Sequence, residues 1–344
     1  MTALFVTPFF TSKPLTGFEN AILRDYEDVK FKYNSAIVVC SSCRNVDASI
    51  EIIVLKNTWL ASFKLLIQSP LSMIARLKNA RLCFFIKDII MNQNYSFVHL
   101  NQPWIFYGPI DEKNLLLQVR FHNDDVKYMQ VLAKLETNIF LKFLLLLESI
   151  KVIYLLKKID STNSQLICYT KKDVIGLKKY LPSTTNIRIL AFPITLLNDI
   201  QHPTSNSRIV FFGGDNRPNR ESLTWLEKNF CPSIDESIDL YSSSESLLKN
   251  YQFSPWIKSR GYSKDMLSLY PSPPIFVFPV FSGSGIKMKV VDAVETGCYV
   301  ITTLEGAAGL GDQHNNLIVL KDFSVKKLFK NIENLRKKNG PLYE

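Results

Sequence analysis

The stretch from residue 274 to residue 310 reads PIFVFPVFSGSGIKMKVVDAVETGCYVITTLEGAAGL. Its apolar start predicts a buried strand over Pro274–Val280, and a glycine loop then leads into a helix predicted over Ile286–Thr296. Gly297 stands where a helix end favours a left-handed residue, and a second strand is predicted over Tyr299–Thr302. A strand, a helix and a further strand in this order form the unit from which parallel sheets are built.

The same alternation extends in both directions along the chain. Short apolar runs bounded by polar residues predict strands over Ala3–Val6, Ser35–Val39, Arg81–Ile86, Ser96–Leu100, Leu115–Val119, Gln165–Tyr169, Arg208–Phe212, Ile238–Tyr241, Trp256–Lys258 and Asn316–Leu320. Helical spacing predicts helices over Gly17–Tyr26, Val126–Leu135, Ile139–Lys158, Arg220–Phe230, Glu245–Tyr251, Lys264–Leu269 and Val325–Lys338. The pattern therefore predicts an α/β protein with parallel sheets covered on both faces.

A chain of 344 residues is too long for one ordinary core, so two domains are expected. The polar segment 196–207, which contains Pro203, marks the junction between them. We therefore expect an N-terminal domain over residues 1–200 and a C-terminal domain over residues 207–344, both doubly wound and Rossmann-like. Because such sheets bind ligands beyond the carboxyl ends of their strands, a cleft between the two domains is the expected site.

The charge balance favours an anionic partner. The formal net charge is +10, and residues 1–200 carry 24 Lys and Arg against 16 Asp and Glu. No block of five or six consecutive basic residues occurs, so we expect no nucleic-acid partner. The start of the chain does not read as a signal peptide, and the six cysteines read as reduced thiols, although Cys40 and Cys43 leave a redox or metal pair open. A cytoplasmic location follows.

One apolar segment raises the question of a membrane. Residues 139–156 read IFLKFLLLLESIKVIYLL, and Lys142, Glu148 and Lys151 interrupt them, whereas a membrane span needs about 20 nearly uncharged residues. The segment predicts a long, partly buried helix. The alternative is an amphipathic face that rests on an anionic membrane as a peripheral contact.

The loop after the strand at 274–280 has the chemistry of a phosphate site. Gly283, Ser284 and Gly285 allow a tight turn and a close backbone approach to a ligand, and a helix start offers N–H groups and positive dipole. Lys287 and Lys289 add cations where a helix disfavours them, which an anionic ligand would offset. Asp292, on the same helix, suits a vicinal diol such as a ribose.

This stretch resembles the donor-binding signature of glycosyltransferase family 4, the group 1 glycosyltransferases with the GT-B fold. The matching positions are Gly283, Gly285, Lys287, Lys289 and Asp292-Ala293, followed by the Thr296–Thr303 pattern and the Glu305–Leu310 loop. In many members a second acid precedes Asp292 by eight positions, where this chain has Ser284.

Two further stretches carry the resemblance. Residues 207–230, SRIVFFGGDNRPNRESLTWLEKNF, match a strand, a turn at Gly213 and Gly214, a Pro218-Asn219 pair and a helix bearing Trp225. Arg217 and Arg220 at this junction are candidates for bidentate contacts to a diphosphate. In the first half, His122 ends a strand in LLLQVRFHNDDVKY (115–128), and Thr16-Gly17 resembles the family's first-strand loop.

The resemblance implies a hexosyltransferase-like enzyme that uses a nucleotide-diphosphate sugar and retains anomeric configuration. His122 would lie near the transferred sugar, Lys289 and Lys287 at the diphosphate, and Asp292 at the ribose. The chain has no Asp-x-Asp, the pair that holds a divalent ion in metal-dependent transferases, so we expect neither a catalytic metal nor a cofactor. The implied acceptor is a saccharide or lipid-linked saccharide of capsule or lipopolysaccharide assembly, handled at the inner face of the cell membrane.

Two alternatives remain from the sequence. A nucleotide-sugar epimerase of the same architecture is one, although the four histidines offer few acid–base residues. A degenerate sugar-nucleotide-binding scaffold is the other, and Ser284 in place of an acid is its support.

Overall fold

The computed structural model of the chain describes all residues except 1, 15–16, 69–73, 93–94, 107–114, 161–163, 183–184, 186, 191, 193, 195, 197–198, 230–236, 243–253, 262–269, 284, 311–313 and 338–344. The helices predicted over Glu245–Tyr251 and Lys264–Leu269 lie outside the described residues. The chain divides into two compact units, Met1–Leu190 and Ala191–Glu344, so the division precedes the polar segment at which we placed the junction.

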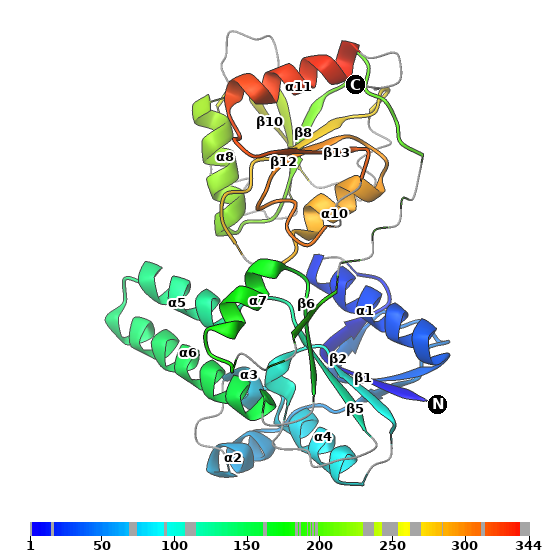
Figure 1. Ribbon diagram of the computed structural model, residues 1–344, viewed down its shortest axis with the longest axis vertical. Helices are drawn as coiled ribbons and strands as arrows, with labels where there is room; N and C mark the ends of the chain where they lie inside the picture. The colour runs from blue at the N-terminus through cyan, green and yellow to red at the C-terminus, as the bar shows by residue number, and fades with distance from the viewer. Residues whose placement is uncertain are drawn as a thin grey trace. The chain divides into compact units, whose positions relative to one another are not determined.

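The N-terminal unit contains a seven-stranded parallel sheet in the order β3-β2-β1-β4-β5-β6-β7. Its strands are β1 (Ala3–Thr11), β2 (Ala36–Arg44), β3 (Ile52–Val54), β4 (Phe97–Leu100), β5 (Leu116–Phe121), β6 (Gln165–Cys168) and β7 (Ile187–Ile189). The helices are α1 (Gly17–Tyr33), α2 (Trp59–Gln68), α3 (Ile74–Leu77), α4 (Ala80–Asn92), α5 (Asp125–Leu135), α6 (Ile139–Asp160) and α7 (Lys171–Lys178), with a 3₁₀ turn, η1, at Pro103–Ile105. Figure 1 shows α5 and α6 side by side as a helical hairpin.

The C-terminal unit repeats the design with a six-stranded parallel sheet in the order β10-β9-β8-β11-β12-β13. Its strands are β8 (Ile209–Phe212), β9 (Ile238–Tyr241), β10 (Ile257–Gly261), β11 (Ile275–Phe278), β12 (Val300–Thr303) and β13 (Leu317–Leu320). Its helices are α8 (Arg217–Asn229), α10 (Met288–Glu295) and α11 (Val325–Lys337), and α8 and α10 lie on opposite sides of the sheet (Figure 1). Two doubly wound parallel sheets confirm the predicted fold class.

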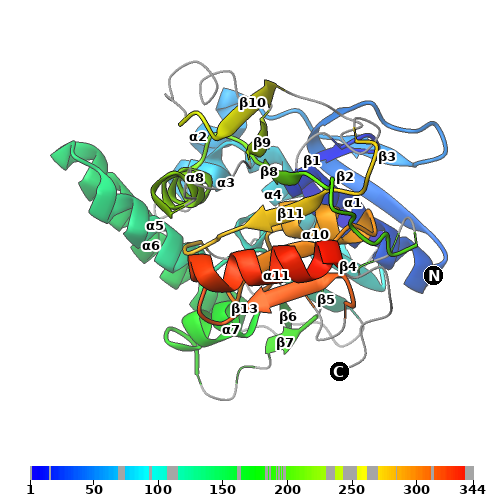
Figure 2. The same ribbon diagram turned by 90° about the horizontal axis from the view of Figure 1, so that it is seen from above.

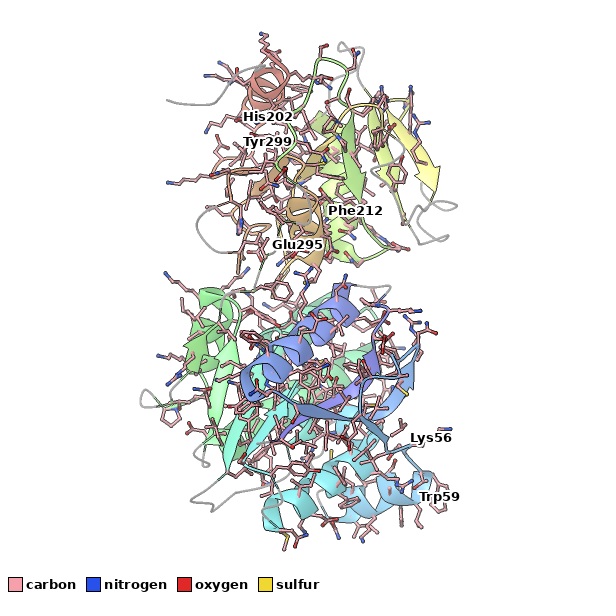
Figure 3. The ribbon with its side chains drawn as sticks, turned by 90° about the vertical axis from the view of Figure 1, so that its right-hand side faces the viewer. Lys56, Trp59, His202, Phe212, Glu295 and Tyr299 are labelled. Carbon is pink, nitrogen blue, oxygen red and sulfur yellow. The ribbon has the colours of Figure 1, made fainter. Side chains whose placement is uncertain are left out.

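The central strands of each sheet are buried on both faces, which is why they read as continuous apolar runs. All four residues of β11 and of β12 are buried, and Phe276 and Phe278 stack with a ring-centroid distance of 6.1 Å. In Figure 3, Tyr299 and His202 lie beside each other at the edge of this unit, where the Tyr299 hydroxyl is 3.3 Å from His202 Nδ1. This contact fixes part of the chain that enters the C-terminal unit.

One sequence prediction was wrong. The segment Arg81–Ile86, expected to be a strand, lies inside helix α4. The buried residues of α4 recur at helical spacing, as Leu82, Cys83, Ile86, Ile89 and Ile90, so one stripe packs against the core. The window RLCFFI is too short to reveal that period, because its apolar residues also fit a buried strand.

Gly297 ends α10 in the left-handed conformation that the sequence predicts, with φ +80°. Replacing Gly297 with Ala forces a β-carbon into that conformation, so we expect the free energy of unfolding to fall by about 1–2 kcal/mol in urea denaturation. Gly214→Ala is the matched control, because no atom lies within 4 Å of its added β-carbon and its φ is not positive. Equal stability of the two variants would contradict this assignment.

Candidate active site

The order of the C-terminal sheet reverses between β8 and β11, which are neighbours although β9 and β10 lie between them in sequence. The helices that follow these two strands lie on opposite faces of the sheet (Figures 1 and 2). In sheets of this kind, such a reversal is the point at which ligands bind. The donor residues predicted from sequence, Gly213 to Arg220 and Gly283 to Lys289, lie in these loops and at the starts of α8 and α10.

Lys289 lies in the first turn of α10 and turns toward the core rather than to solvent. Its ammonium group is 4.5 Å from the ring centroid of Phe211 and 5.1 Å from that of Phe278. Within the described part of the chain, no carboxylate pairs with this group. Burial and the nearby charge of Lys287 lower the pKa of Lys289 to about 7. An anion that reached this ammonium group would relieve the cost of its burial.

Asn219 connects Lys289 to the loop after β8. Its Oδ1 accepts a 2.6 Å hydrogen bond from Lys289 Nζ, and its Nδ2 donates a 2.7 Å hydrogen bond to the Gly214 carbonyl. A β-carbon on Gly213 would lie 2.5 Å from Asn219 Nδ2, so glycine is required for this approach. In the sequence, Asn219 is only part of the Pro218-Asn219 pair that resembles the family pattern. Its hydrogen bond to Lys289 is evident only from the structure.

The glycine loop after β11 is bound by hydroxyl groups on neighbouring elements. Ser222 Oγ on α8 donates a 2.7 Å hydrogen bond to the Pro279 carbonyl, and the Thr303 hydroxyl on β12 donates to the Val280 carbonyl. Gly283 has φ +126° and Gly285 has φ +64°, conformations that side-chain-bearing residues rarely adopt. These φ values suit the tight turn expected at the two glycines, whose contact with a ligand stays a prediction, and Ser284 lies outside the described residues.

Lys287 stands at the N-cap of α10 and pairs with the following loop. Its ammonium group donates to the Gly285 carbonyl at 2.9 Å and lies 3.3 Å from the carboxylate of Glu305. The two lysines of the site therefore differ, because Lys287 has a carboxylate partner and Lys289 is held by an amide. Asp292 is half-buried one turn further along α10. A phosphate near this helix start would meet both ammonium groups and the helix dipole.

Arg217 and Arg220 lie at the start of α8 with exposed side chains. Arg217 Nε is 2.7 Å from Glu221, and Arg220 Nε is 2.6 Å from Asp215. Because these pairs are solvent-exposed, each contributes little stability, and an incoming phosphate could replace the carboxylate. Glu221 also accepts a hydrogen bond from Ser282, so the start of α8 is linked to the glycine loop.

The remaining predicted residues belong to the N-terminal unit. Gly17 begins α1, whereas Thr16 lies outside the described residues. His122 follows β5 and is 9% exposed, with Nε2 2.9 Å from the Asn101 backbone oxygen and 3.1 Å from Asn101 Oδ1. Burial lowers the pKa of His122 to about 4, against the attraction of Asp25, so its imidazole is neutral at pH 7.

His99 on β4 has the same low pKa, about 4, because it is also buried. The unfolded chain then binds more protons than the folded chain between pH 6.5 and pH 4. We expect stability to fall as the pH drops through this range, by roughly 1–3 kcal/mol per histidine. Urea denaturation at several pH values measures this, and His99→Gln should flatten the slope. An equal slope in the variant would contradict the buried neutral state of His99.

Among the described residues, no three His, Cys, Asp or Glu side chains gather in a metal-binding arrangement. No described helix is long and apolar enough to cross a membrane.

Comparisons with known proteins agree with the fold, and one family model covers the part of the chain that contains these loops. Residues 206–338 match the family model described as glycosyl transferases group 1. A Klebsiella pneumoniae protein described as an uncharacterized 44.6 kDa protein in the cps region is 25% identical over 265 residues. That match covers 70% of this chain and 65% of the relative, so the chain spans less than two thirds of the relative's length.

Solved structures share the fold over nearly the whole chain. WaaG, a glycosyltransferase involved in lipopolysaccharide biosynthesis, is 14% identical with a TM-score of 0.62, covering 98% of this chain and 90% of WaaG. HepE of Anabaena, solved with UDP and glucose, is 13% identical with a TM-score of 0.56 and the same coverage. The lipopolysaccharide outer core galactosyltransferase WaaB is 9% identical with a TM-score of 0.58, covering 97% and 90%. The chain therefore shares the GT-B fold of these structures, and its residues 206–338 are similar to the group 1 glycosyltransferase family model.

Proposed function

We propose that the protein transfers a sugar from a nucleotide-diphosphate sugar to a saccharide or lipid-linked acceptor in the assembly of a capsule or lipopolysaccharide. The observation that carries this proposal is the Lys289 ammonium group, which lies at the switch point of the C-terminal sheet without a carboxylate partner among the described residues. The solved structures of HepE with UDP and with UDP-glucose, on the same fold, support a nucleotide-sugar donor.

In this reaction the bond between the anomeric carbon and the diphosphate oxygen breaks, and the acceptor hydroxyl forms the new bond. The departing nucleoside diphosphate gains negative charge as it leaves. Lys289, Lys287 and the start of α10 would stabilise that charge from positions held before the reaction begins, which avoids reorganisation in the transition state. The acceptor proton passes to the leaving phosphate. We further propose that attack occurs on the face the diphosphate leaves, which retains the anomeric configuration.

We propose that these cations take the place of a divalent metal. The diphosphate would contact Lys289 and Lys287, with the exposed Arg217 and Arg220 exchanging their carboxylate partners for phosphate oxygens. Asp292 would bind the ribose hydroxyls, and His122 would lie near the transferred sugar. On this basis transfer should proceed at the same rate in the presence of EDTA.

Lys289→Ala should weaken binding of UDP or of a UDP-sugar by about 10- to 100-fold in isothermal titration calorimetry, since it removes a desolvated cation from the diphosphate. The matched control is Lys228→Ala, an exposed lysine in the last turn of α8.

Binding to the native protein should also weaken from pH 7 to pH 9, because the free Lys289 side chain, with a pKa of about 7, must take up a proton to bind an anion. This pH dependence should disappear in Lys289→Ala. If Lys289→Ala bound UDP with native affinity, the diphosphate could not lie at Lys289.

The epimerase and scaffold alternatives are separated by their products. Incubation with a nucleotide sugar alone would give a new sugar nucleotide if the protein were an epimerase. A scaffold would bind the donor but give no transfer over a broad acceptor panel. Transfer to a saccharide acceptor, with free nucleoside diphosphate released in equal amount, supports the proposed glycosyltransferase.

A surface of the N-terminal unit supports the proposed contact with an anionic membrane. Helix α6 is apolar on nearly all sides, a composition typical of buried helices, yet it packs on α5 and leaves large side chains exposed. They are Ile139, Phe140, Leu141, Phe143, Leu146, Ile150 and Tyr154. Of these, Ile139, Phe143, Leu146, Ile150 and Tyr154 recur at helical spacing on one face, which we call the α6 apolar surface. Another exposed apolar residue of this unit is Trp59 on α2, which lies beside Lys56 in Figure 3.

Basic residues beside the hairpin favour anionic lipid as the occupant. A hollow of about 210 Å³ on α5 and the end of α7 is lined by Lys127, Lys134 and Lys179. Asp124 also lines the hollow and attracts Lys127 and Lys179, but none of the three lysines forms an ion pair with a described residue. The lysines outnumber this carboxylate, so the hollow favours phosphate headgroups.

In vesicle flotation, Phe143→Ser/Ile150→Ser should reduce binding to vesicles with phosphatidylglycerol by about 10-fold or more, since each side chain buries apolar area in the interface. Phe31→Ser, which alters a side chain that is 87% exposed on α1, is the matched control and should bind normally. Equal binding of all three proteins would exclude the α6 apolar surface.

A further inference from the structure

A layer of buried polar side chains lies between α1 and the sheet of the N-terminal unit. The carboxylate of Asp25 on α1 accepts three hydrogen bonds, from Arg120 at 2.9 Å, Tyr169 at 2.8 Å and Asn101 at 2.8 Å. All four residues are at most 5% exposed. Sequence reasoning assigned none of them to the site.

The partners of Asn101 determine which way its amide points. Burial alone would raise the pKa of Asp25, but Arg120, the two histidines and Tyr169 hold that pKa below its usual value. The ionised carboxylate only accepts hydrogen bonds, so Asn101 must present its Nδ2 group to Asp25. Asn101 Oδ1 then faces His122, which explains the 3.1 Å distance to His122 Nε2.

The same geometry determines where His122 carries its proton. Two acceptors of Asn101, its backbone oxygen at 2.9 Å and its Oδ1, face the single nitrogen Nε2. A lone pair on Nε2 would be repelled by both oxygens, so Nε2 must carry the proton. In the neutral imidazole, the acceptor is then Nδ1.

We propose that Asn101, oriented by Asp25, is a positioning residue that holds His122 in its Nε2-protonated neutral tautomer. The catalytic consequence rests on the proposed transferase function. A histidine fixed in one tautomer presents the same hydrogen-bonding face to each substrate, so no fraction of the enzyme is lost to the other tautomer.

The groups around His122 support this single state. Asp25 draws a proton toward the imidazole, whereas Arg120 opposes it, and Arg120 also lies with its guanidinium carbon 4.3 Å from the ring centroid of Tyr169. The Tyr169 and His122 ring centroids are 5.7 Å apart. His99 belongs to the same layer but bonds through Nδ1 to Gln118 Oε1 at 2.8 Å, so the two histidines are fixed by different amides.

The test measures the tautomer directly in the free protein. Two-dimensional NMR of the full chain labelled with ¹⁵N-histidine should show the His122 Nε2-protonated pattern at pH 7 in the native protein. Asn101→Leu keeps the side-chain volume and removes the Oδ1 contact to His122 and the Nδ2 contact to Asp25, while the backbone oxygen of residue 101 remains as an acceptor. The fraction of His122 protonated on Nδ1 should therefore rise to give a mixture of tautomers, and kcat should fall at least 10-fold with a smaller change in the donor KM. Gln118→Leu, the matched control, disturbs the amide at His99 and should leave the His122 pattern unchanged.

A native His122 protonated on Nδ1 overturns the proposal whether or not any variant folds. An unchanged His122 pattern and unchanged kcat in Asn101→Leu also overturn it. A protein that shows the predicted tautomer and its loss in Asn101→Leu, but transfers no sugar, would refute the proposed function and leave the role of Asn101 intact. The two failures are therefore distinguishable.

Discussion

The pairing of β8 with β11 is the contact on which the candidate site depends. Because these strands are neighbours in space but not in sequence, the helices that follow them leave to opposite faces of the sheet. The chain can then place a glycine loop and the starts of two helices around one point without covering it. The side chains that gather there come from α8 and α10, and the Asn219–Lys289 hydrogen bond joins the two helices across the sheet edge.

The two units bury positive charge in different ways. In the N-terminal unit, Arg120 faces the Asp25 carboxylate, so the buried charges compensate each other and form a fixed framework. In the C-terminal unit, Lys289 has an amide and two aromatic rings as its neighbours, which stabilise an ammonium group less than a carboxylate does. The first arrangement is typical of a structural network, whereas the second favours an anionic ligand.

The sequence predicted the order of most strands and helices, because buried parallel strands are short apolar runs with polar ends. It also predicted the glycine positions at 283, 285 and 297, where positive φ leaves few other residues possible. It failed where a short window fits two periods, as in Arg81–Ile86. It could not predict the layer around Asp25, since residues 25, 101, 120 and 169 are far apart in the chain and each is unremarkable in its local pattern. All assignments of residues to substrate, those of Lys287 and Lys289 as well as those of Arg217, Arg220, Asp292 and His122, stay predictions.

The close contact between Gly213 and Asn219 makes the two loops of the site depend on each other. A β-carbon at residue 213 would displace the Asn219 amide, and that amide holds the Lys289 ammonium group. A change at any of these three positions alters the packing of the other two. In an alignment of close relatives, the residues at positions 213, 219 and 289 should therefore change together rather than one at a time.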